Sequence, residues 1–165
     1  MTGLLPGILR QLHASLATHA PEQSIAILQE AGYAAGEGLY KAFTAANNPA
    51  DLDADLLAPT LSEFFTTGGW GAVTVTPVGT GALAIDSANW SEAEPGTSQS
   101  PMCFFSAGML ADFLGRLSEE TIAVMEVECR SKGDERCRFL SATPALLEKV
   151  YTEMTQGRTY EEALA

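Results

Sequence analysis

The chain has 165 residues and a mass of 17.4 kDa, with 21 acidic and 9 basic residues and a formal net charge of -12. Hydrophobic residues make up 46% of it and charged residues 18%, a composition too apolar for a disordered acidic tail. Because phosphate recognition depends on clustered Lys and Arg, this acidity argues against nucleic acid or an anionic lipid surface as the main partner.

The length and the cysteine content predict one cytoplasmic domain. We take this domain to span residues 1–165, with a helical part at 1–66 and a part at 67–165 that contains the sheet and the C-terminal helix. No apolar run reaches the roughly 18 residues needed to span a bilayer, and residues 1–7 lack the basic start of a signal peptide. In a reducing compartment, three cysteines favour thiol or metal chemistry over a disulfide.

Apolar spacing predicts three helices in the first part of the chain. Residues 4–20 carry leucines and an isoleucine on one helical stripe. A second helix begins just after Pro21 and contains Gly32, Gly36 and Gly38, each of which costs about 1 kcal/mol relative to Ala. Close approach of a helix, a strand or a ligand to that face would compensate for this cost. After a loop at 47–51, a short third helix is expected over 56–66.

The pattern changes to alternation after Gly69. Residues 70–78 and 82–88 are predicted strands that form a hairpin around Gly79-Thr80-Gly81. A loop at 91–100 leads to a fourth helix at 103–117, and two further strands at 121–129 and 136–141 flank a turn at Gly133. An amphipathic C-terminal helix begins at Thr143-Pro144. The order α-α-α-β-β-α-β-β-α predicts the α+β class, with an antiparallel sheet packed against helices.

Cys129 and Cys137 are placed symmetrically about Gly133. A hairpin that turns there brings the two cysteines opposite each other, with Cβ atoms about 5 Å apart. That separation suits two ligands of one metal ion, and tetrahedral zinc needs four. Cys103, at the start of the fourth helix, is the candidate for a third thiolate. Both histidines lie far away, on the first helix.

Glu126 and Glu128 are the local candidates for the fourth ligand. Strand alternation places Glu126 on the opposite face from Cys129, so it joins the cysteines only if the strand twists, bulges or ends between them. Alternation also separates Glu128 from the adjacent Cys129. Buried cysteines are usually inert and paired glutamates usually form a solvated face, so on spacing alone a purely structural interpretation stays open.

Three segments of the C-terminal half are the most distinctive part of the sequence, at residues 101–108, 126–129 and 133–139. Together they resemble the 4-vinyl reductase domain family, and weaker similarity at 31–36 and 69–71 extends the resemblance over nearly the whole chain. That family includes bacterial proteins linked to bacteriochlorophyll synthesis and the sensor domains of regulators that respond to aromatic hydrocarbons. Its fold is related to that of small TRAPP vesicle-tethering subunits.

The resemblance implies a zinc site. Metal-binding members of the family hold one zinc with the pattern Cys-x22-Glu-x2-Cys-x7-Cys. This chain keeps every spacing at Cys103, Glu126, Cys129 and Cys137, so the resemblance selects Glu126 over Glu128. Four protein ligands leave no open coordination position, and the implied zinc is therefore structural. Its expected role is to pin the hairpin to the fourth helix.

The resemblance also implies a ligand pocket, because the sensor members bind an apolar or aromatic molecule beside the zinc. The candidate wall residues here are aromatic: Trp90, Trp70, Phe104, Phe65, Phe64 and Tyr33. Trp90 looks like the pocket tryptophan of the family. Aromatic residues at these spacings belong more often to the core, and the polar groups that orient a phenolic ligand in the sensors have no clear counterpart in this sequence.

Three functions remain open at this point. The first is a module that binds a small hydrophobic molecule, acts as a homodimer and passes its signal to an unidentified protein partner, since no output domain follows residue 165. The second is an enzyme or accessory factor of vinyl-tetrapyrrole metabolism. The sequence shows no dinucleotide motif and no nucleophile–base pair, which argues against this function, and we assign no catalytic residue. The third is a dimerisation or tethering unit without a ligand. We expect the first.

The charge is unevenly distributed. Residues 126–138 hold four acids and four bases, which are Arg130, Lys132, Arg136 and Arg138, so the remaining 152 residues carry the whole net charge. We interpret these bases as counter-charges around an anionic zinc–thiolate centre.

Overall fold

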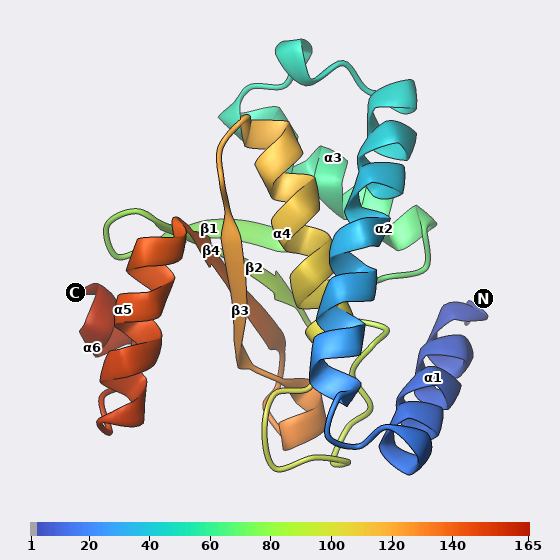
Figure 1. Cartoon of the computed structure of the whole chain (residues 1–165). Coiled ribbons are helices and arrows are strands. Elements are labelled where there is room, and N and C mark those ends of the chain that lie inside the picture. Colours follow the sequence, from blue (N-terminus) through green and yellow to red (C-terminus); the bar gives the residue numbers. More distant parts are fainter. Residues whose placement is uncertain (1–2) are drawn as a thin grey trace.

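The computed structural model describes residues 3–165, in which helices cover both faces of one antiparallel sheet (Figure 1). The helices are α1 (Leu5–His19), α2 (Ser24–Ala46), α3 (Ala54–Thr67), α4 (Phe104–Ser118), α5 (Pro144–Thr155) and α6 (Tyr160–Leu164). The strands are β1 (Thr74–Val78), β2 (Ala82–Ser87), β3 (Ala123–Glu128) and β4 (Cys137–Ala142), and short 3-10 turns occupy η1 (Pro49–Asp51) and η2 (Arg130–Lys132). The predicted α+β class is confirmed.

The sheet has the strand order β1-β2-β4-β3, and every neighbouring pair is antiparallel. Both predicted hairpins, β1–β2 and β3–β4, are therefore confirmed. They are joined by pairing of β2 with β4, in which Ile85 lies opposite Phe139. Pro77 lies in β1, at the edge of the sheet, where a missing backbone N–H is tolerated.

Side-chain caps define where several helices begin. Asp53 accepts from two backbone N–H groups of α3, and Thr143 accepts from the backbone of α5. The predicted single C-terminal helix is wrong, because Gly157, with φ +92°, ends α5 and turns the chain. Thr159 and Glu162 then form a capping box that begins α6.

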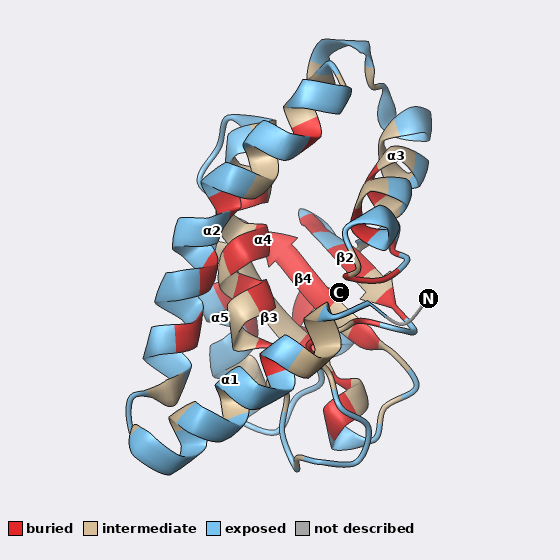
Figure 2. Cartoon of the chain, turned by 90° about the vertical axis from the view of Figure 1, so that its right-hand side faces the viewer, coloured by how far each residue is buried: buried red, intermediate tan, exposed pale blue. Residues whose placement is uncertain are grey.

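Each face of the sheet contributes to a separate hydrophobic core. On one face, Ile85 and Phe139 pack with residues of α1, α2, α3 and α4, and on the other, Ala84 and Leu140 pack with α5 and α6. Buried residues follow the strands and the inward sides of α2 and α4 (Figure 2). The cysteines belong to the first of these cores.

Helices α2 and α4 pack so closely that glycine is required between them. A Cβ atom added to Gly32 would overlap the carbonyl oxygen of Phe105, and one added to Gly36 would overlap the carboxylate of Asp112. Gly38, by contrast, has no neighbour within 4 Å of such an atom. The expected compensation by helix packing is therefore confirmed for two of the three glycines of α2.

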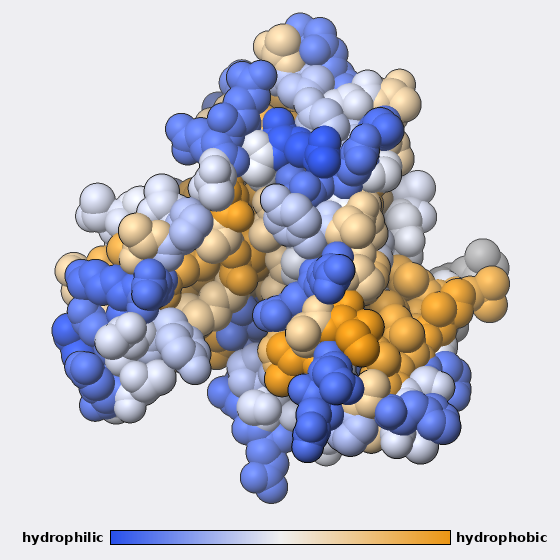
Figure 3. All heavy atoms as spheres, viewed as in Figure 1, coloured by the Kyte–Doolittle hydropathy of each residue, from blue (hydrophilic) through white to orange (hydrophobic). Residues whose placement is uncertain are grey.

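Helix α1 is held to the rest of the chain by few buried side chains. Leu9 is its one buried residue within the described chain, while Ile8 is 61% exposed and Leu4, at the N-cap position before the helix, is 84% exposed. Figure 3 shows the resulting hydrophobic surface over α1 at the lower right of the molecule. The apolar stripe predicted at residues 4–20 is thus divided between the core and the surface.

Candidate metal centre, aromatic core and comparisons

The predicted metal ligands lie together. Cys103, Glu126, Cys129 and Cys137 each offer one ligand atom, and these atoms all lie within 4.8 Å of one another, an arrangement that can hold a metal ion. The three cysteines are fully buried and form no disulfide. The sulfur atoms of Cys103 and Cys129 are 3.9 Å apart.

Three different elements supply these side chains. Cys103 immediately precedes α4, Cys129 follows β3, and Cys137 begins β4. The connection between the strands is longer than a tight hairpin turn, since it contains η2 and then Gly133 at φ +106°. The Asp134 carboxylate closes this loop by accepting from the backbone N–H of Cys129 at 2.8 Å.

A β-bulge explains how Glu126 reaches the cysteines. In the pairing of β3 with β4, Glu126 lies opposite Phe139 and Glu128 opposite Arg138, so Val127 is an extra residue in β3. The bulge shifts the alternation by one residue. Glu126 therefore faces the cysteines, and Glu128 lies on the other face of the sheet, as the selection of Glu126 required.

The two carboxylate oxygens of Glu126 have different surroundings. Oε2 accepts from the backbone N–H of Cys103 at 2.9 Å. Oε1 is buried and has no hydrogen-bond partner among residues 3–165, a condition that is costly for a polar atom. Burial, followed by the charge of Cys129, raises the pKa of Glu126 to about 8. A cation at the cluster would satisfy Oε1 and oppose both effects.

The thiols interact strongly with one another. Hydrogen bonds from the thiols of Cys103 and Cys137 lower the pKa of Cys129, while the bond to Cys129 raises the pKa of Cys103. The protein alone therefore favours one thiolate that is shared by two thiols. A divalent ion would allow all three sulfurs to ionise, so the donor set and the unpartnered oxygen of Glu126 both fit a bound metal.

The interpretation of the nearby bases as counter-charges of the metal centre is wrong for Arg136 and Arg138. Alternation along β4 places both on the opposite face from Cys137. Arg138 forms two 2.7 Å hydrogen bonds with the Asp86 carboxylate, and Arg136 pairs with Glu128 at 3.0 Å. These bases therefore neutralise carboxylates beneath the C-terminal helices.

Tyr160, at the start of α6, completes this charged network. Its hydroxyl donates to Glu128 Oε2 at 2.8 Å and accepts from Arg138 Nη1 at 3.2 Å. Burial and the bond to Glu128 raise the pKa of Tyr160 to about 12. Sequence reasoning missed this contact, which fastens α6 to the face of the sheet opposite the cysteines.

Four of the six predicted pocket aromatics belong to one packed cluster. Trp90 is fully buried, with its ring centroid 5.4 Å from that of Trp70 and 5.6 Å from that of Phe65. Phe64 contacts Phe65 edge to face at 5.5 Å. The indole N–H of Trp90 donates to the Ser106 hydroxyl at 2.7 Å.

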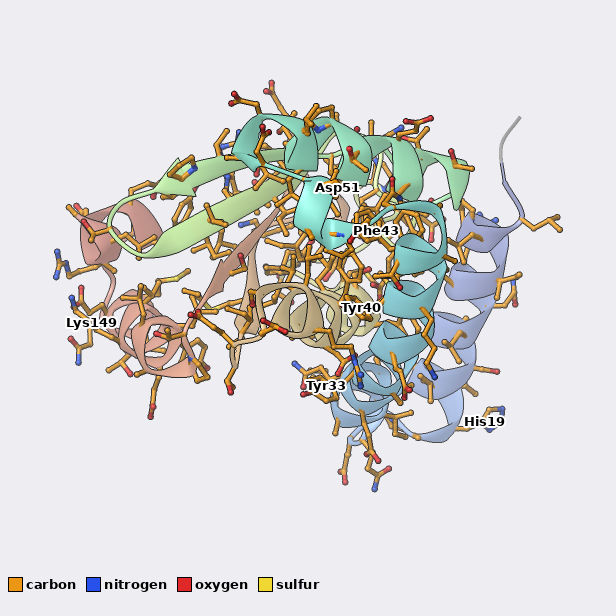
Figure 4. All side chains as sticks on the ribbon, turned by 90° about the horizontal axis from the view of Figure 1, so that it is seen from above. His19, Tyr33, Tyr40, Phe43, Asp51 and Lys149 are labelled. Carbon is orange, nitrogen blue, oxygen red and sulfur yellow. The ribbon has the colours of Figure 1, made fainter. Side chains whose placement is uncertain are left out.

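The other two predicted wall residues lie elsewhere. Tyr33 is 55% exposed on α2 (Figure 4). Phe104 lines a cavity of about 560 Å³ between α1, α2 and the loop of residues 91–102. The predicted set is therefore divided between the aromatic core, this cavity and the surface.

Glu92 is a buried polar residue that the sequence analysis missed. Its carboxylate accepts from the backbone N–H groups of Phe105 at 3.1 Å and Ser106 at 2.8 Å, and from the Ser106 hydroxyl at 2.5 Å. His13 Nε2 lies 2.8 Å from its Oε1. Glu92 caps α4 in this way, because Cys103 at the N-cap position makes no side-chain capping bond. Glu92 lies in a polar loop, and no local sequence pattern indicates that its carboxylate caps α4.

Comparison with known proteins supports the resemblance drawn from the sequence. The family model of the 4-vinyl reductase domain matches residues 88–142, a segment that contains the whole cysteine–glutamate cluster. No curated protein matches the chain. Within the described residues, no helix is long and apolar enough to cross a membrane.

Three solved structures resemble this chain. The phenol-responsive sensory domain of the transcription activator PoxR with phenol has a TM-score of 0.69 and 15% identity, over 94% of this chain and 82% of that one. A trafficking protein particle complex subunit 3 from Naegleria fowleri, covalently bound to palmitic acid, has a TM-score of 0.63 and 13% identity, over 84% of this chain and 93% of that one. A vinyl-4-reductase family protein from Methanocaldococcus jannaschii has a TM-score of 0.48 and 19% identity, over 86% of this chain and 95% of that one. The first two establish a shared fold.

Proposed function

We propose that this chain, whose residues 88–142 match the 4-vinyl reductase domain, is a zinc-stabilised module that binds a small hydrophobic molecule. One observation carries the metal half of this proposal. The buried Oε1 of Glu126 has no partner within the described chain, and it belongs to a group whose other three ligand atoms are cysteine sulfurs. A bound cation accounts for this arrangement better than an apolar core does.

The donor set favours zinc over calcium and magnesium. Thiolates are preferred ligands of zinc, and four protein ligands are typical of its structural sites. Calcium and magnesium prefer oxygen ligands, so three sulfurs exclude them. The proposed zinc links the start of α4 to the end of β3 and the start of β4. It therefore acts as a structural clamp, without the open coordination position that catalysis needs.

The ligand half of the proposal rests on the shared fold and on the interior of this chain. Two of the matched structures are a domain crystallised with phenol and a subunit covalently bound to palmitic acid, so this fold accommodates apolar molecules of different shapes. In this chain, Trp70, Trp90 and Phe65 belong to the same hydrophobic core as Cys103, and Phe104, next to Cys103, lines the cavity of about 560 Å³. A small hydrophobic or aromatic ligand is compatible with these surroundings.

The proposed module acts as a homodimer in the cytoplasm and signals through a protein partner. The exposed apolar side chains of Ile8 on α1 and of Leu4 just before it support an association surface. The unpaired thiols suit a reducing compartment.

Native mass spectrometry of protein purified under reducing conditions tests this function. We expect the mass of two chains with one zinc per chain, together with an apolar molecule that organic extraction releases. A metal-free chain that takes up no zinc would contradict the metal half. A zinc-loaded chain that carries no apolar molecule and is not stabilised by any member of an aromatic and aliphatic panel would contradict the ligand half.

A further inference from the structure

The cavity between α1, α2 and the loop of residues 91–102 has the properties of a ligand site. Its volume of about 560 Å³ falls within the range of small-molecule sites. Apolar residues line it from both helices and from the end of the loop, with Ala17 on α1, Leu28 on α2, and Met102 and Phe104 at the junction with α4, while Thr97 and Ser100 add polar groups on the loop side. This mixed lining suits an apolar body that carries a hydrogen-bonding group.

His13 and Glu92 supply the polar group of this cavity. The Glu92 side chain is completely buried, and that of His13 is 14% exposed. A carboxylate that receives the donors of Phe105 and Ser106 is an acceptor, so His13 must donate to it from Nε2. A neutral imidazole that donates from Nε2 has an acceptor at Nδ1, and no group within residues 3–165 makes a hydrogen bond to His13 Nδ1.

The charged groups around the cavity already have partners. The Glu92 carboxylate accepts hydrogen bonds from the backbone N–H groups of Phe105 and Ser106, and at the rim Arg10 lies 3.6 Å from Glu94. A charged ligand would either break one of these interactions or bury an unmatched charge, and both are unfavourable. An uncharged ligand avoids both penalties.

Helix α1 provides a way into the cavity. It forms one wall, yet Leu9 is its one buried residue in the described chain. Several lining residues on or beside α1 are themselves exposed, among them Arg10, Ala17 and Ile25, so a ligand can reach the cavity directly from the solvent.

We propose that this cavity binds an uncharged apolar molecule that carries a single N–H or O–H donor, and that His13 Nδ1 accepts that donor. The inference rests on the proposed ligand-binding function and assigns to it a location, a recognition residue and a class of ligand. Ligand binding here also touches Phe104, next to Cys103, so the site adjoins the metal centre through the first turn of α4.

Three fluorescent probes with the same aromatic body test the recognition chemistry on the full zinc-loaded chain. N-phenyl-1-naphthylamine is neutral and has one N–H, its N-methyl derivative lacks the N–H, and 1-anilinonaphthalene-8-sulfonate adds a charge. We expect the wild type to bind the first probe about fivefold more tightly than the second, as one hydrogen bond predicts, and the third most weakly. In His13→Phe the first two probes should bind equally. If His13→Phe prefers N-phenyl-1-naphthylamine over the N-methyl derivative as strongly as the wild type does, the role of His13 is overturned.

Two variants of α1 test the location. Ala17 lines the cavity, whereas Ser15 is exposed and does not. We expect Ala17→Phe to weaken N-phenyl-1-naphthylamine binding at least tenfold and Ser15→Phe to leave it unchanged, with circular dichroism melting to show that both variants fold.

The failures of the two proposals are distinguishable. Saturable binding that is equal in Ala17→Phe and Ser15→Phe would place the ligand elsewhere and overturn this inference, while leaving the proposed function intact. The absence of saturable binding of every probe, in protein that also co-purifies with no apolar molecule, would overturn both.

Discussion

The backbone N–H of Cys103 donates to Glu126 Oε2 at 2.9 Å, and this bond joins the residue before α4 to the residue before the bulge of β3. One oxygen of the carboxylate thus fixes the start of a helix, while the other, Oε1, remains without a partner in the described chain. The same side chain can therefore position a protein element and bind a metal. This dual role explains why a glutamate, with two separate oxygens, is suited to the position.

Replacing the proposed carboxylate ligand should weaken zinc binding selectively. Glu126→Gln keeps an oxygen that can accept from Cys103 but removes the negative charge, so we expect zinc affinity to fall at least tenfold, as measured by competition with a chromophoric chelator. Glu128→Gln is the matched control, because Glu128 faces Tyr160 and Arg136 on the other side of the sheet. Equal loss of affinity in the two variants would contradict the assignment.

Removing the metal should destabilise the fold. A ligand that binds only the native state adds about 4 kcal/mol to the free energy of unfolding at a thousand times its dissociation constant. We therefore expect a strong chelator to lower the unfolding midpoint of the wild type in urea markedly. Cys137→Ser should start from the lower midpoint and respond little to the chelator. An unchanged wild-type midpoint after verified metal removal would show that the clamp is not structural.

The glycines of α2 should respond oppositely to alanine. Gly32→Ala places a methyl group against the backbone carbonyl of Phe105, which cannot rotate away, so we expect a loss of about 1–3 kcal/mol. Gly38→Ala occupies open space on an exposed part of the helix and should gain about 0.5–1 kcal/mol through helix propensity. Chemical denaturation of the two variants measures both effects, and a shared sign would refute the close α2–α4 packing.

The hydroxyl of Tyr160 should make stability depend on pH in the alkaline range. Its pKa rises from about 10 to about 12 on folding, so the unfolded chain loses this proton first. The stabilisation is fully present below pH 10 and is lost as the pH rises to about 12. We expect Tyr160→Phe to be about 1 kcal/mol less stable than the wild type at pH 8, and this difference to shrink across that window. A constant difference from pH 8 to 12 would argue against the network with Glu128 and Arg138.

The complete metal-ligand set could be predicted from the sequence because its spacing resembles that of a known family. The paired strands around Gly133 explain why Cys129 and Cys137 meet, but the residues alone left the fourth ligand open between Glu126 and Glu128. The bulge at Val127 was not predictable in the same way. It depends on how β3 pairs with β4, and no residue in this segment marks it locally, so strand alternation alone argued against Glu126.

Other features had signals that local reasoning did not use. The alternation applied to β3 also holds for β4, and it would have placed Arg136 and Arg138 opposite Cys137. Thr159, followed three residues later by Glu162, is a capping-box pattern that indicates a new helix after Gly157. By contrast, the bond between His13 and Glu92 joins residues 79 apart in sequence. Such long-range partners follow from the packing of α1, which no local pattern specifies.

The most direct test of the account is X-ray absorption spectroscopy at the zinc edge of the zinc-loaded chain. Coordination by Cys103, Cys129, Cys137 and Glu126 predicts a shell of three sulfurs at about 2.3 Å and one oxygen at about 2.0–2.2 Å. A shell dominated by nitrogen and oxygen, or one that is unchanged in Cys137→Ser, would contradict the central claim that these four side chains hold the metal.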